Sequence, residues 1–307
     1  MTGSPVNYDP VSTPHPPNEN INERALVLGG GGVAGIAWMT GLLFGLTEKS
    51  VNLHHADLIL GTSAGSAVAA QLGSSSSLQQ LFRRQVDPAL QTREITPDPR
   101  LREQLQAAIP AMVLPDRAES ARQFGRWALQ ASTVPEAERR FVVAERLPSH
   151  SWPDRLLRIV AVDTATGEAR IFDRFSGTEL IDAVAASCAV PGVWPPVTID
   201  GHRYMDGAVR SADNADLAKG YARIVILSPF GTRPDEIVGI PLNEQMETLE
   251  KAGAMTYLIE PDNPSKDAIG INALLPETRQ PAAEAGRNQG RAIAKALAAF
   301  WTSTPSG

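Results

Sequence analysis

Two short apolar runs that each stop at glycines constrain the fold of this chain more than any other feature. Arg24–Leu28 leads into a glycine run, and Ala56–Leu60 leads into a second, glycine-flanked turn. A short apolar run bounded by glycines is typical of a buried parallel strand. The segments that follow, Ile36–Leu46 and Ser66–Leu72, have the composition of helices packed on a sheet. Strand, turn and helix in repetition predict an α/β fold.

The rest of the chain extends this prediction to a three-layer α/β/α architecture with a mostly parallel central sheet. Residues 78–146 hold amphipathic stretches such as Leu101–Met112 and Arg122–Leu129 and no strand pattern, so we expect a helical insertion there, after the second helix. Apolar runs predict further strands, and an alanine-rich run predicts a closing helix: strands at Leu156–Asp163, Ala169–Asp173, Arg203–Met205, Arg223–Leu227 and Met255–Ile259, and a helix at Ala282–Trp301.

The composition limits the number of domains and the kinds of binding partner that we expect for this chain. The 307 residues are 43% hydrophobic and 20% charged, which suits one domain, expected over residues 23–303. Residues 1–22 are rich in Pro, Asn, Ser and Thr and are expected to form a disordered tail, with a short C-terminal tail at 304–307. A net charge of −6 without a basic tract argues against nucleic acid as a partner.

The sequence predicts a cytoplasmic protein. The N-terminal residues lack the apolar core of a signal peptide, and no apolar run is long enough for a transmembrane segment. Cys188 is the single cysteine, which excludes an intramolecular disulfide. Because it lies among small apolar residues, we interpret it as a buried structural thiol and not as a nucleophile.

The second glycine-flanked turn is a candidate nucleophile turn. It reads Gly61-Thr62-Ser63-Ala64-Gly65, the G-x-S-x-G pattern that exposes a serine between a strand and a helix. The two outer glycines permit the sharp turn and keep side chains away from the hydroxyl. The dipole of the helix that follows favours negative charge near the serine. Ser63 is therefore the candidate nucleophile of an acyl-transfer reaction.

The first glycine run is a candidate oxyanion site. Consecutive N–H groups of Gly30, Gly31 and Gly32 at a helix N-terminus can form a nest for an anion. The same run, closed by Gly35, also fits the G-x-G-x-x-G fingerprint of dinucleotide-binding proteins, which remains an alternative. Asp57 is at about the required distance for that alternative, but it begins the next predicted strand instead of ending it.

Asp206 is the candidate base. It follows the predicted strand Arg203–Met205 and precedes Gly207, and we expect it to meet Ser63 where the ends of adjacent parallel strands converge. A carboxylate in a water-poor pocket gains the basicity needed to accept the serine proton. The alternative is a Ser-His-Asp esterase that uses His202 with Asp163 or Asp182. His202 falls in a predicted hairpin tip, which favours Asp206.

Together these motifs resemble the patatin-like phospholipase family, over roughly residues 24–227. The family pattern is a glycine-rich oxyanion motif, a G-x-S-x-G nucleophile and a D-G-A or D-G-G aspartate. Ala186–Pro196 also looks like the family segment that precedes that aspartate. The resemblance implies a hydrolase of lipid esters or phospholipids with a Ser63–Asp206 dyad, without histidine.

The resemblance further implies that Gly30, Gly31 and Gly32 donate to the oxyanion and that no metal or cofactor is needed. One departure is Ala34, which stands where many members carry an arginine, so a charge near the oxyanion site is expected to be missing. We also hypothesise that the apolar faces of the helical insertion make transient contact with substrate or a membrane surface.

Overall fold

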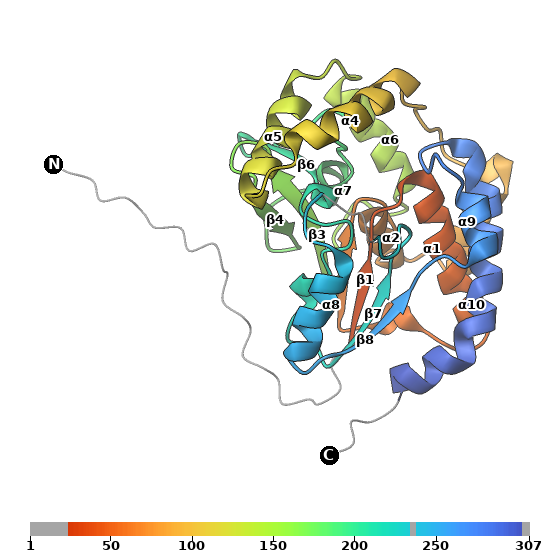
Figure 1. Cartoon of the computed structure of the whole chain (residues 1–307). Coiled ribbons are helices and arrows are strands. Elements are labelled where there is room, and N and C mark those ends of the chain that lie inside the picture. Colours follow the sequence, from red (N-terminus) through yellow and green to blue (C-terminus); the bar gives the residue numbers. More distant parts are fainter. Residues whose placement is uncertain (1–23, 234–237, 303–307) are drawn as a thin grey trace.

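A computed structural model describes residues 24–233 and 238–302, and its secondary structure follows the predicted α/β pattern (Figure 1). The tails predicted at residues 1–22 and 304–307 lie outside the described residues.

The core is an eight-stranded sheet with the order β5-β6-β3-β2-β1-β7-β8, and β4 also pairs with β3. Neighbours among β1, β2, β3, β7 and β8 are parallel, which confirms the predicted mostly parallel sheet. The strands are β1 Arg24–Leu28, β2 Leu58–Thr62, β3 Leu156–Asp163, β4 Ala169–Phe172, β5 Val197–Ile199, β6 His202–Asp206, β7 Arg223–Leu227 and β8 Met255–Ile259. Burial on both faces explains why the central strands are continuous apolar runs.

Helices cover both faces of the sheet, which completes the three layers (Figure 1). The larger layer contains α1 (Gly32–Thr47), α2 (Ala64–Leu72), α7 (Leu180–Ser187) and α10 (Arg279–Thr302), which share a core with one face of the strands. α9 (Asn263–Ile269) packs beside α10. On the opposite face, α8 (Leu242–Lys251) buries Leu242 and Leu249 against the other side of the same strands.

The insertion between α2 and β3 is helical, as predicted. It consists of α3 (Leu78–Val86), α4 (Pro99–Met112), α5 (Arg117–Gln130) and α6 (Glu136–Arg146), with a 3-10 turn at Pro88–Leu90 in the longer connection between α3 and α4. α4 and α5 bury Met112 and Phe124 against Val162 of β3 and Met205 of β6, and they lie across the top of the molecule in Figure 1. α6 packs on α7, so the insertion covers the end of the sheet where β2 and β6 finish.

The direction of β6 differs from the parallel direction that we expected for the strand ending at Asp206. β6 is antiparallel to β3, so Asp206 does not end a parallel strand as expected. β3 pairs with β2 up to Val160, which lies opposite Thr62, and pairs with β6 from the next residue, Ala161, which lies opposite Asp206. The ends of β2 and β6 are thus registered on consecutive residues of β3. Sequence periodicity gives strand positions but not strand direction, which explains the error.

Candidate active site

Ser63 lies in the sharp turn between β2 and α2 that its motif predicts. Its backbone has φ 52° and ψ −117°, a left-handed conformation that is rare and strained for a residue with a side chain. The flanking glycines are required by contact: a Cβ on Gly65 would lie 1.9 Å from the Leu28 carbonyl oxygen, and one on Gly61 would lie 2.6 Å from the Cα of Ser66. The close packing of the turn therefore holds the serine in this conformation.

The Ser63 hydroxyl donates a hydrogen bond to Asp206. The distance between Ser63 Oγ and Asp206 Oδ2 is 2.8 Å, and the other carboxylate oxygen accepts the Ala208 N–H at 2.9 Å. Asp206 is 2% exposed, and burial raises its pKa from 3.8 to about 7, although both hydrogen bonds oppose this shift. A carboxyl with this pKa has the basicity of a general base near neutral pH. Gly207 permits the contact, since a Cβ there would lie 2.4 Å from the Val160 carbonyl oxygen.

The last residue of α7 and the segment that follows it hold Ser63 and Asp206 in place, a role that sequence reasoning did not assign to them. The Ser63 N–H donates to Ser187 Oγ at 2.9 Å, and that hydroxyl donates to the Val160 carbonyl at 2.6 Å. The Asp206 N–H donates to the Ala189 carbonyl at 2.9 Å. Cys188 is buried, as predicted; burial raises the pKa of its thiol, which donates to the Ser63 carbonyl at 3.2 Å.

The glycine run lies beside Ser63, but it offers fewer donors than expected. Gly30 donates its N–H to the Ala212 carbonyl at 2.8 Å, so this amide is occupied, which corrects its assignment as an oxyanion donor. The N–H groups of Gly31 and Gly32 have no acceptor within the described part of the chain. α1 begins at Gly32, so its positive end is at this loop. A Cβ on Gly35 would lie 3.3 Å from Pro229, so close packing explains the glycine at this position.

The geometry does not favour the dinucleotide alternative. Asp57 precedes β2, and its carboxylate accepts the N–H of Arg24 at the first residue of β1. The glycine run follows the last residue of β1. The acidic side chain and the glycine loop are thus at opposite ends of the same strand, whereas a ribose contact requires them at one edge.

His202 is remote from Ser63. It begins β6, whereas Asp206 ends it, and five residues of strand place the two about 13 Å apart. Its ring contacts Asp163 at 3.0 Å, and its side chain is 63% exposed. Asp182, the other proposed partner, instead binds Arg140. The geometry therefore pairs Ser63 with Asp206 and leaves His202 as a surface histidine.

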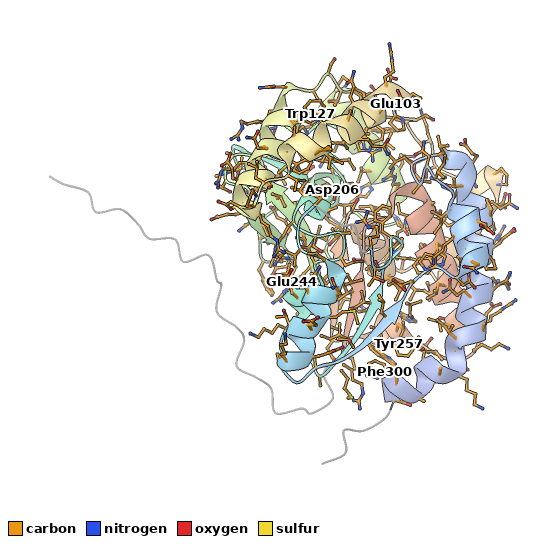
Figure 2. The ribbon with its side chains drawn as sticks, viewed as in Figure 1. Glu103, Trp127, Asp206, Glu244, Tyr257 and Phe300 are labelled. Carbon is orange, nitrogen blue, oxygen red and sulfur yellow. The ribbon has the colours of Figure 1, made fainter. Side chains whose placement is uncertain are left out.

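A cavity of about 540 Å³ opens onto Ser63, Asp206 and the glycine run. Most of its other walls are apolar and come from the insertion, from α9 and from the loops around them. Leu105 and Ile109 of α4 and Phe124 of α5 form one wall. In Figure 2, Asp206 lies below Trp127 of α5 and Glu103 of α4, in the region between the insertion and the sheet. A space of this size, apolar and ending at the dyad, suits a hydrocarbon chain.

The model of the patatin-like phospholipase family matches residues 26–219. The chain belongs to this family, whose members are hydrolases that act on lipid ester bonds. The match covers the glycine run, the serine turn and Asp206. No curated protein matches the chain.

Three solved structures similar to this chain have low identity and TM-scores below 0.5. VipD from Legionella pneumophila is 12% identical with a TM-score of 0.45, and the match covers 90% of this chain and 67% of that one. The type III effector protein ExoU is 19% identical with a TM-score of 0.39, covering 90% and 53%. Full-length ExoU in complex with SpcU, from the type III secretion system of Pseudomonas aeruginosa, is 18% identical with a TM-score of 0.40, covering 92% and 53%. The chain spans about half the length of the ExoU chains.

The described residues contain neither a candidate membrane-spanning helix nor a candidate metal-binding cluster. None of the helices in residues 24–233 and 238–302 is long and apolar enough to cross a membrane. The same residues hold no group of three or more His, Cys, Asp or Glu side chains arranged to bind a metal ion.

Proposed function

We propose that this chain is a serine lipid acyl hydrolase that uses Ser63 as nucleophile and Asp206 as general base. The observation that carries the proposal is the 2.8 Å hydrogen bond between the serine hydroxyl and the buried carboxylate, at the base of an apolar cavity. Family membership supports the lipid ester as substrate class.

The reaction proceeds in two acyl-transfer steps. Ser63 Oγ attacks the ester carbonyl while its proton moves to Asp206 Oδ2, and the carbonyl oxygen becomes an oxyanion. The N–H groups of Gly31 and Gly32, at the positive end of α1, donate to this oxyanion. The tetrahedral intermediate collapses as Asp206 returns the proton to the leaving alcohol, which leaves an acyl-serine. Water then attacks the acyl-serine and gives one proton to Asp206, which passes it to Ser63 Oγ as the acyl–oxygen bond breaks and the fatty acid leaves.

The cavity supports contact with a lipid surface. Phe230 and Ile271 both line it and are 42% and 95% exposed, so two apolar side chains of its wall reach solvent. Exposed apolar groups at a cavity mouth favour transient contact with lipid. We propose that a cytoplasmic protein makes this contact at a membrane surface and draws one acyl chain into the cavity.

Labelling with a fluorophosphonate probe tests the dyad. Wild type, Ser63→Ala, Asp206→Asn and His202→Ala are treated in parallel, and the labelled residue is located by mass spectrometry. We expect wild type and His202→Ala to be labelled at Ser63, and the other two variants to lose labelling. A His202→Ala variant that loses labelling, while Asp206→Asn keeps it, would replace the dyad by a Ser-His-Asp arrangement.

Lipid hydrolysis by the same four proteins tests the substrate class. The expected result is release of fatty acid from mixed phospholipid and acylglycerol micelles by wild type and His202→Ala only. Release from soluble short-chain esters alone would support an esterase and would contradict a lipid acyl hydrolase.

A further inference from the structure

A buried arginine of the insertion lies beside the nucleophile without hydrogen-bond partners. Arg139 of α6 is 4% exposed, and its Nε and Nη1 atoms are enclosed with no acceptor among the described residues. Its guanidinium stacks over the Trp194 ring, with Cζ 3.9 Å from the ring centroid. Stacking positions the planar group but uses none of its N–H donors. Buried N–H donors without acceptors are costly, so a ligand is expected to complete them.

The charges around Arg139 favour an anion. Glu94 is the carboxylate of this cluster, but its two oxygens already accept from Arg146 and Arg279, at 2.5 to 2.9 Å. Arg139, Arg146 and Arg279 thus face two carboxylates, Glu94 and the ionised Asp206, which leaves a formal excess of one positive charge in a buried region. Burial and the neighbouring Arg146 lower the pKa of Arg139 to about 9. An anion beside Arg139 would reduce this excess and stabilise its charged form.

A small void connects Arg139 to the reaction centre. It measures about 20 Å³ and is lined by Arg139, Trp194 and Ser63, together with Arg146 and its ion-pair partner Glu94. Ser63, Gly32 and Leu274 also line the large cavity, so the void branches from that cavity at the nucleophile. It has room for about one oxygen-sized group. A group bound in the large cavity can therefore place one anionic oxygen against the guanidinium.

We propose that Arg139 is a specificity-determining residue that binds a phosphate oxygen of the substrate, adjacent to the ester that Ser63 cleaves. The inference rests on the proposed function of the Ser63 site and adds the leaving group to it: an alcohol that carries a phosphodiester. The planar fork of a guanidinium matches phosphate oxygens. A carboxylate at the far end of a fatty acyl chain would lie deep in the large cavity, away from this void. Arg139 thus supplies a cation that Ala34, in the glycine motif, does not.

Two substrates that differ only in the phosphodiester test whether Arg139 favours substrates that carry a phosphate. Phosphatidylcholine and the diacylglycerol with the same acyl chains are compared in micelles at about pH 8, where Asp206 is largely ionised. We expect Arg139→Gln to lower kcat/KM for the phospholipid about 10- to 100-fold, the range for a lost charged hydrogen bond, and to change hydrolysis of the diacylglycerol less than about threefold. An equal loss on both substrates, or no loss on either, overturns the proposal.

Arg140→Gln is the matched control. Arg140 is the next residue of α6, and its guanidinium binds Glu179 and Asp182 at the surface. This variant loses one positive charge from the same helix, and it should keep the phospholipid preference of wild type. Thermal unfolding monitors the fold of each variant. If Arg139→Gln does not fold, Arg139→Lys is used instead, because lysine keeps the positive charge without the planar guanidinium. This variant should lower the ratio of kcat/KM for the phospholipid to kcat/KM for the diacylglycerol several-fold. An unchanged ratio overturns the proposal.

A binding measurement separates this proposal from the proposed function. Titration of sn-glycero-3-phosphocholine, followed by phosphorus NMR, requires no turnover. Wild type, Ser63→Ala and Arg140→Gln should bind this phosphodiester, and Arg139→Gln should bind it at least about tenfold more weakly. This result stands even if no ester is hydrolysed, in which case the proposed function fails and the phosphate site remains. Failure of wild type to bind the phosphodiester, or binding of inorganic phosphate alone, overturns the proposal.

Discussion

Replacing Asp206 by Asn should abolish hydrolysis and, at neutral and higher pH, stabilise the protein. The carboxyl is fully enclosed, and its folded-state pKa of about 7 is well above its ordinary value of 3.8. An asparagine has the same shape: its Oδ1 can accept the Ala208 N–H, and its amide can donate to the Ser63 hydroxyl. It cannot accept the serine proton, and it carries no charge to be desolvated.

The sign and size of the effect follow from proton linkage. Because the folded protein holds this proton up to about pH 7 and the unfolded chain releases it near 3.8, wild type loses stability as pH rises between these values. A difference of about three pKa units corresponds to about 4 kcal/mol at about 1.4 kcal/mol per unit. The Asp206→Asn variant does not lose this stability as pH rises, because asparagine carries no ionisable proton. The stability difference between the variant and wild type should therefore grow by up to about 1.4 kcal/mol per pH unit from about pH 4, and level above about pH 7.

Urea unfolding of both proteins at a series of pH values from 5 to about 8.5 measures this difference. Ionisable groups that do not interact with Asp206 contribute equally to both proteins and cancel in the comparison, and the pKa of Arg139, which does interact with it, is about 9 and lies above this range. A stability difference that does not change with pH would show that Asp206 ionises in the folded state near its ordinary pKa. That result would refute the argument that burial makes it a base.

Four further predictions concern the same site. The kcat/KM for ester hydrolysis should rise with pH and level above about 7, because only ionised Asp206 accepts the serine proton; a decline over this range in a pH–rate profile contradicts the assignment. His202→Ala should retain kcat within about twofold in the same assay, since surface substitutions outside special sites are nearly neutral. Gly31→Ala should lower kcat about 100- to 1,000-fold, as for a lost oxyanion donor, because the new Cβ would lie 2.5 Å from Pro229 and displace the loop; unchanged rates would exclude this loop from the reaction. Leu105→Glu should reduce hydrolysis of long-chain lipids several-fold while sparing short soluble esters, because the carboxylate enters the apolar wall of the cavity. If the substitution changed the rates on the two substrate classes by the same factor, acyl-chain binding at this wall would be excluded.

The local geometry of the site could be predicted because short segments encode it. The strained turn at Ser63 needs glycines on both sides, and the start of α1 needs a glycine loop. Each feature therefore appears in the sequence as a short motif of adjacent residues. The apolar runs of β1, β2 and β7 identify buried strands for the same reason. In each case the physical requirement acts within a few residues of the motif.

Features that depend on distant parts of the chain were missed or misjudged. The direction of β6 is set by pairing with β3, and the Gly30 amide is occupied by the carbonyl of Ala212, far along the chain. The sequence does not predict that Arg139 is buried at the site, because an arginine on an amphipathic helix is expected to face solvent. The packing of α6 against α7 brings Arg139 to the site. Tertiary packing, and not local propensity, decided each of these.

The shared use of β3 has an evolutionary consequence. Ser63 and Asp206 are 143 residues apart, yet the ends of their strands are registered on two consecutive residues of one central strand. The chain between β2 and β3, which includes the helices that wall the cavity, does not set that register. This lineage can therefore lengthen, shorten or exchange those helices, and with them the shape of the cavity, while the spacing of Ser63 and Asp206 is inherited unchanged.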